Sequence, residues 1–173
     1  GATYDKTGSF QETCRLTIDK FPNKRSAKKR IYDYAVPVRG FIKGNKIWKM
    51  VQEGLEGANF LDLRIPFATV AVDIANGEEV TLDSDSVADA VRASIAIPGV
   101  FEPLHLHERW LVDGAVVNSV PASVLIRKGI NYIIGVFLVS RRSKAEWNPI
   151  RGPHIINVLT RSYDIIRSQT CLL

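Results

Sequence analysis

The chain has 173 residues, a net charge of +5 and 46% hydrophobic residues, which fits a single globular unit with a mild preference for anionic partners. The basic run at 24–30 and the pair Arg141 and Arg142 lack the interleaved aromatics of nucleic-acid readers, so we expect no nucleic-acid partner. They are interpreted as a solvated face, with membrane-surface contact as the alternative. Cys14 and Cys171 lie near opposite ends without ligand spacing, which indicates neither a disulfide framework nor a zinc site and fits a reducing compartment.

No segment of the sequence has the pattern of a membrane anchor or a signal peptide. The longest apolar stretch, within 133–139, is too short to cross a bilayer, and no charged segment followed by an apolar one opens the chain. We therefore expect a protein that is cytoplasmic or peripheral at a membrane surface. Residue 1 is a glycine, which indicates a processed or truncated chain.

The first element predicted in chain order is a helix that begins at Asn45. Residues 1–35 are polar and weakly periodic, so they are expected to be mostly loop. From Asn45 onward the apolar residues follow helical spacing, Asn45 is placed to cap the helix, and Gly54 or Gly57 is placed to end it. The residues that carry this spacing are Ile47, Trp48, Val51 and Leu55.

A β-hairpin is predicted next. Residues 67–75 form a nearly continuous apolar run, as in a strand that is covered on both faces. The dipeptide Asn76-Gly77 that follows is a strong tight-turn signal into a second strand over 78–82. After it, Ser86 and Asp89 approximate a capping box for a short helix that ends before Pro98.

The second half of the sequence predicts a strand, a helix and a strand in succession. Residues 109–114 are a brief strand, Pro121 opens a helix through about Lys128, and 131–139 are a second buried strand. This order implies a parallel crossover. The tail after Pro153 predicts an amphipathic helix that docks on the sheet. Its predicted apolar face carries Ile155, Ile156, Leu159, Tyr163 and Ile166, and its polar face carries Arg161, Asp164 and Arg167.

Alternating helices and buried strands indicate an α/β domain, in which chemistry gathers at the carboxyl ends of strands. Asp113 lies at such an end, where an apolar strand runs into Gly114. Two interpretations are open from spacing alone: a common Asp-Gly turn, or a catalytic carboxylate.

The segments around Asp113 resemble a known family. Ala93 to Phe101, which reads ASIAIPGVF, and the motif Asp113-Gly114-Ala115 resemble the patatin-like phospholipase family, particularly its bacterial branch and the related catalytic domain of neuropathy target esterase. The resemblance covers roughly 36–140. It implies a three-layer α/β/α fold with a mostly parallel central sheet, incomplete in this chain.

That resemblance also implies a Ser-Asp catalytic dyad. Asp113 matches the family's acid, and Gly114, Ala115 and Asn118, with Ser119 beside them, match or brace its loop. The family's serine lies in a GxSxG elbow, and its oxyanion hole lies in a glycine-rich loop. The sequence contains neither, since Gly8-Ser9 lacks the second glycine. We expect both to precede residue 1, so that 1–173 is the carboxyl-terminal part of one patatin-like hydrolase domain and is inactive alone.

The expected function is hydrolysis of lipid acyl esters, with a phospholipid or lysophospholipid as substrate, through an acyl-enzyme and without a cofactor. A carboxylate that is partly desolvated is basic enough to take the serine proton directly, and backbone amides hold the oxyanion. The alternative is a catalytically inactive patatin-like domain that binds lipid or protein. No calcium loop is visible in the sequence.

Four other polar residues receive a structural interpretation. Ser94 ends a helix and belongs to the family's Ala-Ser segment rather than acting as nucleophile. His105 and His107 alternate on one predicted strand face as a possible metal pair, but no third ligand is evident, so they are interpreted as rim residues. Asp73 is expected to be a hydrogen-bonded strand or turn residue.

Overall fold

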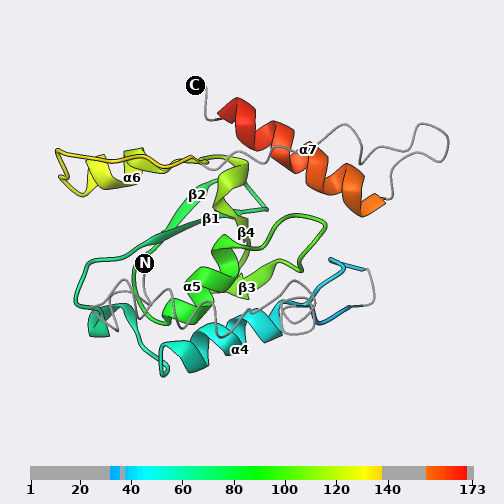
Figure 1. The fold of residues 1–173 in the computed structure, drawn as a ribbon, viewed down its shortest axis with the longest axis horizontal. Coiled ribbons are helices and arrows are strands. Elements are labelled where there is room, and N and C mark those ends of the chain that lie inside the picture. Colours follow the sequence, from blue (N-terminus) through cyan, green and yellow to red (C-terminus); the bar gives the residue numbers. More distant parts are fainter. Residues whose placement is uncertain (1–31, 36–37, 138–154, 171–173) are drawn as a thin grey trace.

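A computed structural model describes residues 32–35, 38–137 and 155–170. The fold is α/β, as the sequence predicts (Figure 1). The helices are α4 (Asn45–Gly54), α5 (Val87–Ser94), α6 (Ala122–Arg127) and α7 (Ile155–Thr170), with short 3-10 helices η1 (Phe60–Asp62) and η2 (Gly114–Val116). The strands are β1 (Thr69–Asp73), β2 (Glu79–Leu82), β3 (Leu104–Leu106) and β4 (Arg109–Asp113).

The four strands form one sheet in the order β2-β1-β4-β3. The predicted hairpin is confirmed: β1 and β2 are antiparallel, the Gly77 N–H donates to the Asp73 carbonyl at 2.8 Å, and Gly77 has a φ of 76°. β4 pairs antiparallel with β1 on one side and with β3 on the other. Ala71 lies at the centre, opposite Val80 and Asp113.

The predicted parallel crossover is wrong for the described part of the chain. Residues 131–137 form no strand, and the side chains of Tyr132, Ile134 and Val136 are 85%, 80% and 74% exposed. Every strand pair in the described sheet is antiparallel. A β-branched run predicts a strand only where another strand is available to complete its backbone hydrogen bonds, which sequence alone does not reveal. Residues 138 and 139 lie outside the described ranges.

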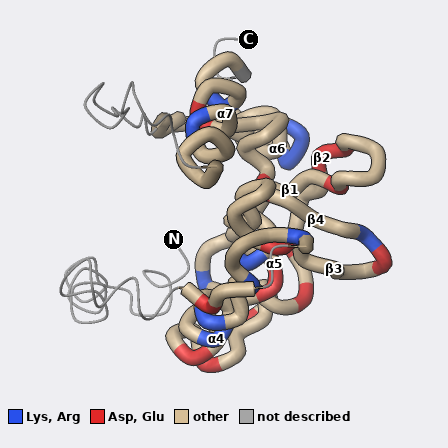
Figure 2. Tube along the Cα trace, turned by 90° about the vertical axis from the view of Figure 1, so that its right-hand side faces the viewer, with Lys and Arg blue, Asp and Glu red and all other residues tan. Residues whose placement is uncertain are grey.

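The sheet lies between two pairs of helices. In Figure 1, α4 and α5 lie on one side of it and α6 and α7 on the other, and Figure 2 shows the same order from a direction at right angles. α5 contacts both central strands, β1 and β4, and α4 packs on the outside of α5. The small side chains of Ala71 and Ala93 allow this close approach, and they form one buried cluster with Leu111.

The two helices below the sheet begin with different caps. Ser86 caps α5 as predicted, since its hydroxyl accepts a hydrogen bond from the Asp89 N–H at 3.2 Å. The prediction that Asn45 caps α4 is wrong. The Asp33 carboxylate instead accepts from the backbone N–H groups of Gly44 and Asn45, both at 2.8 Å, and of Lys46 at 3.3 Å. α4 ends at Gly54, one of its two predicted stops.

α7 forms where the sequence predicts it, but its docked face differs from the expected one. Ile155, Ile165 and Ile166 are 66%, 47% and 47% exposed, whereas Tyr163 and Arg167 are half-buried. The helix packs against η2 rather than flat on the sheet. The predicted loop at 1–31, Gly8-Ser9, the basic run, Arg141 and Arg142, and both cysteines fall outside the described residues. Among the described helices, none combines the length and apolarity required to span a bilayer.

Candidate functional site

Asp113 is the last residue of β4 and the residue that caps η2. Its backbone N–H donates to the Ala96 carbonyl at 3.0 Å, which ties the strand end to the segment after α5. Its carboxylate Oδ1 accepts from the Ala115 N–H at 2.9 Å. The side chain therefore makes the local turn contact typical of an Asp-Gly sequence, and its second oxygen is not used by that contact.

Gly114 is required here for space rather than for a positive φ. A Cβ built on it would lie 2.4 Å from the carbonyl oxygen of Val70 and 2.6 Å from its carbonyl carbon, both of them backbone atoms. The residue is fully buried against β1. A glycine after Asp113 therefore lets the loop turn directly over the neighbouring strand, which fixes the direction of the carboxylate.

Burial raises the pKa of the Asp113 carboxyl above its ordinary value, and three groups act against that rise. The hydrogen bond from the Ala115 N–H, a hydrogen bond from the Tyr163 hydroxyl, and the charge of Arg167 all favour the carboxylate. A carboxylate with a raised pKa is a stronger base than an exposed one. The site thus holds a half-buried carboxylate whose pKa is raised by burial and lowered again in part by groups of α7.

Tyr163 is a site residue that the sequence analysis placed only on an apolar helix face. Its pKa lies far above the ordinary value because of burial first and of the Asp113 charge second. It therefore stays protonated and acts as a hydrogen-bond donor to Asp113. No local pattern could have identified this contact, since fifty residues of chain separate the two side chains.

The residues predicted to brace the loop act at a distance from the carboxylate. Asn118 donates to Glu79 of β2 at 2.5 Å and to Ser123 at 3.1 Å, and does not touch Asp113. The Ser119 Oγ lies 3.2 Å from the Ala115 carbonyl oxygen and 2.9 Å from the Arg167 carbonyl oxygen, so these two acceptors share its single proton. Asn118 therefore ties the loop to the sheet, and Ser119 ties it to α7.

Glu79 anchors this bracing. Burial alone would raise its pKa, but hydrogen bonds from Asn118 and Arg127 and the Arg127 charge outweigh burial and lower it. The Arg127 guanidinium lies 2.6 Å from the Glu79 carboxylate. Glu79 is thus ionised at neutral pH and links β2 both to the Asp113 loop and to α6.

No serine in the described residues hydrogen-bonds to Asp113. Ser94 is the last residue of α5, the place the sequence predicts. Asp73 is buried and accepts from the Ala75 N–H at 3.1 Å, as expected of a turn residue. Because β1 and β4 run antiparallel, Asp73 pairs with Leu111 and lies toward the opposite end of the strand pair from Asp113.

The two histidines interpreted as a possible pair lie in different surroundings. His105 stacks on Trp110 with 4.7 Å between ring centroids. His107 lies beyond the end of β3 with a φ of 48°, and its Nε2 is 3.7 Å from Asp85 Oδ2. Within 32–35, 38–137 and 155–170, no three His, Cys, Asp or Glu side chains are arranged to hold a metal ion.

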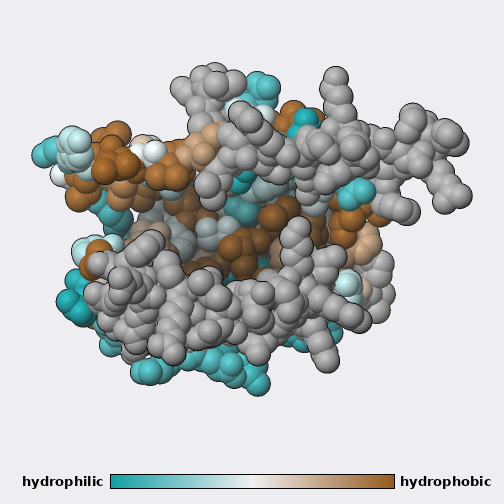
Figure 3. Space-filling model, in the orientation of Figure 1, coloured by the Kyte–Doolittle hydropathy of each residue, from teal (hydrophilic) through white to brown (hydrophobic). Residues whose placement is uncertain are grey.

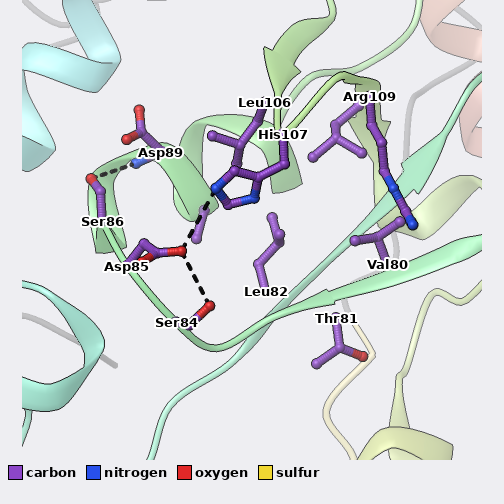
Figure 4. A pocket seen from close by; sticks show the side chains of 12 residues that line it. Val80, Thr81, Leu82, Ser84, Asp85, Ser86, Asp89, Leu106, His107 and Arg109 are labelled. Carbon is purple, nitrogen blue, oxygen red and sulfur yellow. Dashed lines mark hydrogen bonds and ion pairs between the residues drawn. The ribbon is translucent and has the colours of Figure 1, made fainter.

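His107 lies at the rim of a cavity of about 390 Å³ beside the N-terminus of α5 (Figure 4). Ser84 donates to the Asp85 carboxylate at 3.3 Å, and His107 contacts that same carboxylate. In a catalytic triad the histidine lies between the serine and the acid. Here the acid lies between the other two, so these three residues do not have the order of a triad. The cavity lining does not include Asp113.

A second, apolar groove of about 350 Å³ begins beside the Asp113 loop. Ser119, which bonds to Ala115, and Val70, on which Gly114 packs, both line it. Its remaining walls are almost entirely apolar. They comprise Pro66, Phe67, Ala68, Val120, Pro121, Ala122, Val124, Leu125, Ile133, Ile134, Gly135 and Val136.

Comparison with known proteins shows which proteins this chain is similar to. The family profile described as patatin-like phospholipase matches residues 3–126. The chain is 37% identical over 94 residues to an NTE family protein of Mycobacterium tuberculosis, which covers 54% of this chain and 16% of the relative. It is 27% identical over 146 residues to the neuropathy target esterase sws of Drosophila melanogaster, covering 72% of this chain and 10% of that protein.

A mouse relative shows a similar coverage. Patatin-like phospholipase domain-containing protein 7 of Mus musculus is 24% identical over 147 residues, or 82% of this chain and 11% of the mouse protein. The chain thus spans between a tenth and a sixth of the length of these three curated relatives.

Proposed function

This chain belongs to the patatin-like phospholipase family, and from that premise we propose that it supplies the catalytic base of a serine esterase that hydrolyses acyl esters of lipids. Asp113 is the base. It takes the proton of a serine hydroxyl as the serine oxygen attacks the ester carbonyl, and then gives that proton to the leaving alcohol. Water hydrolyses the resulting acyl-enzyme by the reverse proton transfers.

The observation that carries this proposal is the half-buried carboxylate at the end of β4. A serine hydroxyl needs a nearby base to become a nucleophile, and burial raises the pKa of Asp113 toward the range in which a carboxylate accepts that proton. The Asp113 side chain still has acceptor capacity beyond its bond to Ala115. This is the arrangement that a dyad without histidine requires.

The proposed partner serine lies in a part of the natural protein outside these 173 residues. The sequence has no GxSxG elbow and no glycine cluster for an oxyanion loop. Residues 1–173 would then be the carboxyl-terminal part of one patatin-like domain and would be inactive by themselves. The apolar groove beside the Asp113 loop supports a lipid substrate, because an acyl chain needs an apolar surface near the reacting ester.

Replacing Asp113 tests the proposal directly. In the full-length natural protein, we expect Asp113→Asn to abolish hydrolysis of a p-nitrophenyl acyl ester, since an amide cannot accept the serine proton. The melting temperature should change by only a few degrees, because the Asn oxygen still accepts from Ala115. Because the pKa of Asp113 is higher in the folded state than in the unfolded chain, the free energy of unfolding falls as the pH rises through that pKa and the carboxyl loses its proton. Replacing the charged side chain by a neutral amide therefore does not destabilise the protein at neutral pH.

Fluorophosphonate labelling separates the enzyme from a binding module. The full-length protein and the 173-residue chain are labelled in parallel, and the modified residue is mapped by mass spectrometry. Labelling only of the longer form, at a serine outside this chain, supports the dyad. Labelling of Ser94 or Ser9 would refute it, and labelling of neither form would favour the alternative, a catalytically inactive lipid- or protein-binding domain.

A further inference from the structure

α7 contacts the Asp113 region along a single face of the helix. Leu159, Tyr163 and Arg167 are spaced four residues apart, so their side chains lie above one another on one side of the helix. The polar members of this set explain why the docked face differs from the apolar face that the sequence predicts. The helix is oriented by its contacts to the site rather than by burial of its isoleucines, which stay exposed.

Each of these three residues meets a different segment of the site. Leu159 packs on Gly99, where a Cβ would lie 2.9 Å from the leucine Cδ1. The Tyr163 hydroxyl bonds to the Asp113 carboxylate. The Arg167 carbonyl accepts from Ser119 at 2.9 Å, and Ser119 is itself bonded to Ala115. The contacts of Leu159 and Arg167, one helical turn before and after Tyr163, therefore hold Tyr163 in place with its hydroxyl at the Asp113 carboxylate.

We propose that Tyr163 is a positioning residue for Asp113, which α7 brings to the carboxylate and which fixes the orientation of that carboxylate. This inference rests on the proposed role of Asp113 as the base. An aspartate has two rotatable bonds, and one hydrogen bond to Ala115 fixes only one of its oxygens. A second donor from a packed helix restricts the remaining rotation, so that the free lone pairs point in one direction.

The charged surroundings of Asp113 make this role testable through pH. Among the described residues, the groups that bear on its carboxylate are Tyr163 and Arg167, both on α7. Asp164 acts on Tyr163 and raises the pKa of that hydroxyl. β1 and the segment after α5 meet Asp113 with Ala71 and the Ala96 carbonyl, neither of which is titratable. Changes in α7 should therefore move the titration of Asp113, and changes elsewhere on the surface should not.

Tyr163→Phe in the full-length natural protein tests the proposal, with kcat/KM for a p-nitrophenyl acyl ester measured from acid to neutral pH. The hydroxyl favours the carboxylate, so its loss raises the pKa of Asp113 and moves the acid limb of the profile to higher pH. On the plateau at neutral pH, above the acid limb, loss of orientation should lower kcat/KM about tenfold. Tyr132→Phe is the matched control, since Tyr132 is 85% exposed, and its profile should coincide with that of the wild type.

The outcomes separate this inference from the proposed function. If the wild type has no activity, or Asp113→Asn retains it, the role of Asp113 as base is wrong. If Asp113→Asn is inactive and the pH profile of Tyr163→Phe coincides with that of the wild type, the role of Asp113 as base is supported and the positioning role of Tyr163 is refuted. Should Tyr163→Phe fail to fold, Leu159→Ala decides, because it weakens the contact of α7 with Gly99 without removing a charge. An acid limb moved to higher pH supports the role of α7 in placing Tyr163, and an unmoved one overturns it.

Discussion

At the residue scale, Gly114 and Gly77 are both required, but for different physical reasons. Gly114 is needed because the backbone of Val70 occupies the space of a side chain. Gly77 is needed because its φ of 76° suits a residue without a Cβ, although nothing lies within 4 Å of that position. Steric exclusion by backbone atoms is the more severe of the two constraints, because backbone atoms of a central strand cannot move away.

Gly114→Ala should therefore lower the free energy of unfolding by about 3 kcal/mol, because the new methyl group overlaps the Val70 carbonyl. Gly77→Ala, the matched change in open space, should cost only about 1 kcal/mol from its positive φ. Urea denaturation followed by circular dichroism measures both values. Equal losses in the two variants would contradict the steric explanation.

At the scale of elements, the helices are correctly located by local signals, but their caps and docked faces are set by distant residues. α4 begins where its apolar spacing starts, yet its first N–H groups are satisfied by Asp33, which lies 11 residues before Gly44. A carboxylate at this position also interacts favourably with the positive end of the helix. Asn45, the cap predicted by local rules, remains exposed.

The two candidate caps of α4 can be compared by substitution. Asp33→Ala removes the acceptor of three backbone N–H groups and should destabilise the fold by about 2 kcal/mol. Asn45→Ala, at the first position of the helix, should be nearly neutral. Thermal melts of both variants against the wild type distinguish them. A larger loss of stability in Asn45→Ala than in Asp33→Ala would contradict this expectation and favour Asn45 as the cap of α4.

At the scale of the whole molecule, apolar surface gathers on the α6 and α7 side. Figure 3 shows hydrophobic residues over α6 and the segment that follows it. Ile126, Tyr132, Ile134 and Val136 are exposed there, as are several isoleucines of α7. Monomeric soluble domains seldom expose contiguous apolar patches of this kind, so this surface is suited to packing against further protein or lipid.

The isolated 173-residue chain should accordingly self-associate as its concentration rises. Replacing Ile134 and Val136, 80% and 74% exposed, by lysine should reduce this association without altering the fold, because neither side chain belongs to the buried core. Sedimentation velocity over a range of concentrations measures the effect. The exposed Lys49 and Glu53 lie on α4, on the other side of the sheet. Exchanging these two charges is a control that should leave the association unchanged.

The family, the α/β class, the hairpin, the location of α4 to α7 and the choice of Asp113 as the candidate acid could all be predicted from the amino-acid sequence. Each of these follows from local periodicity, turn chemistry or a contiguous motif, all of which are properties of neighbouring residues. The partners of Asp113, the remote cap of α4, the docked face of α7 and the antiparallel sheet became visible in the folded structure alone. Those depend on residues far apart in the chain, such as Tyr163 and Asp113, whose meeting is set by packing and leaves no local pattern.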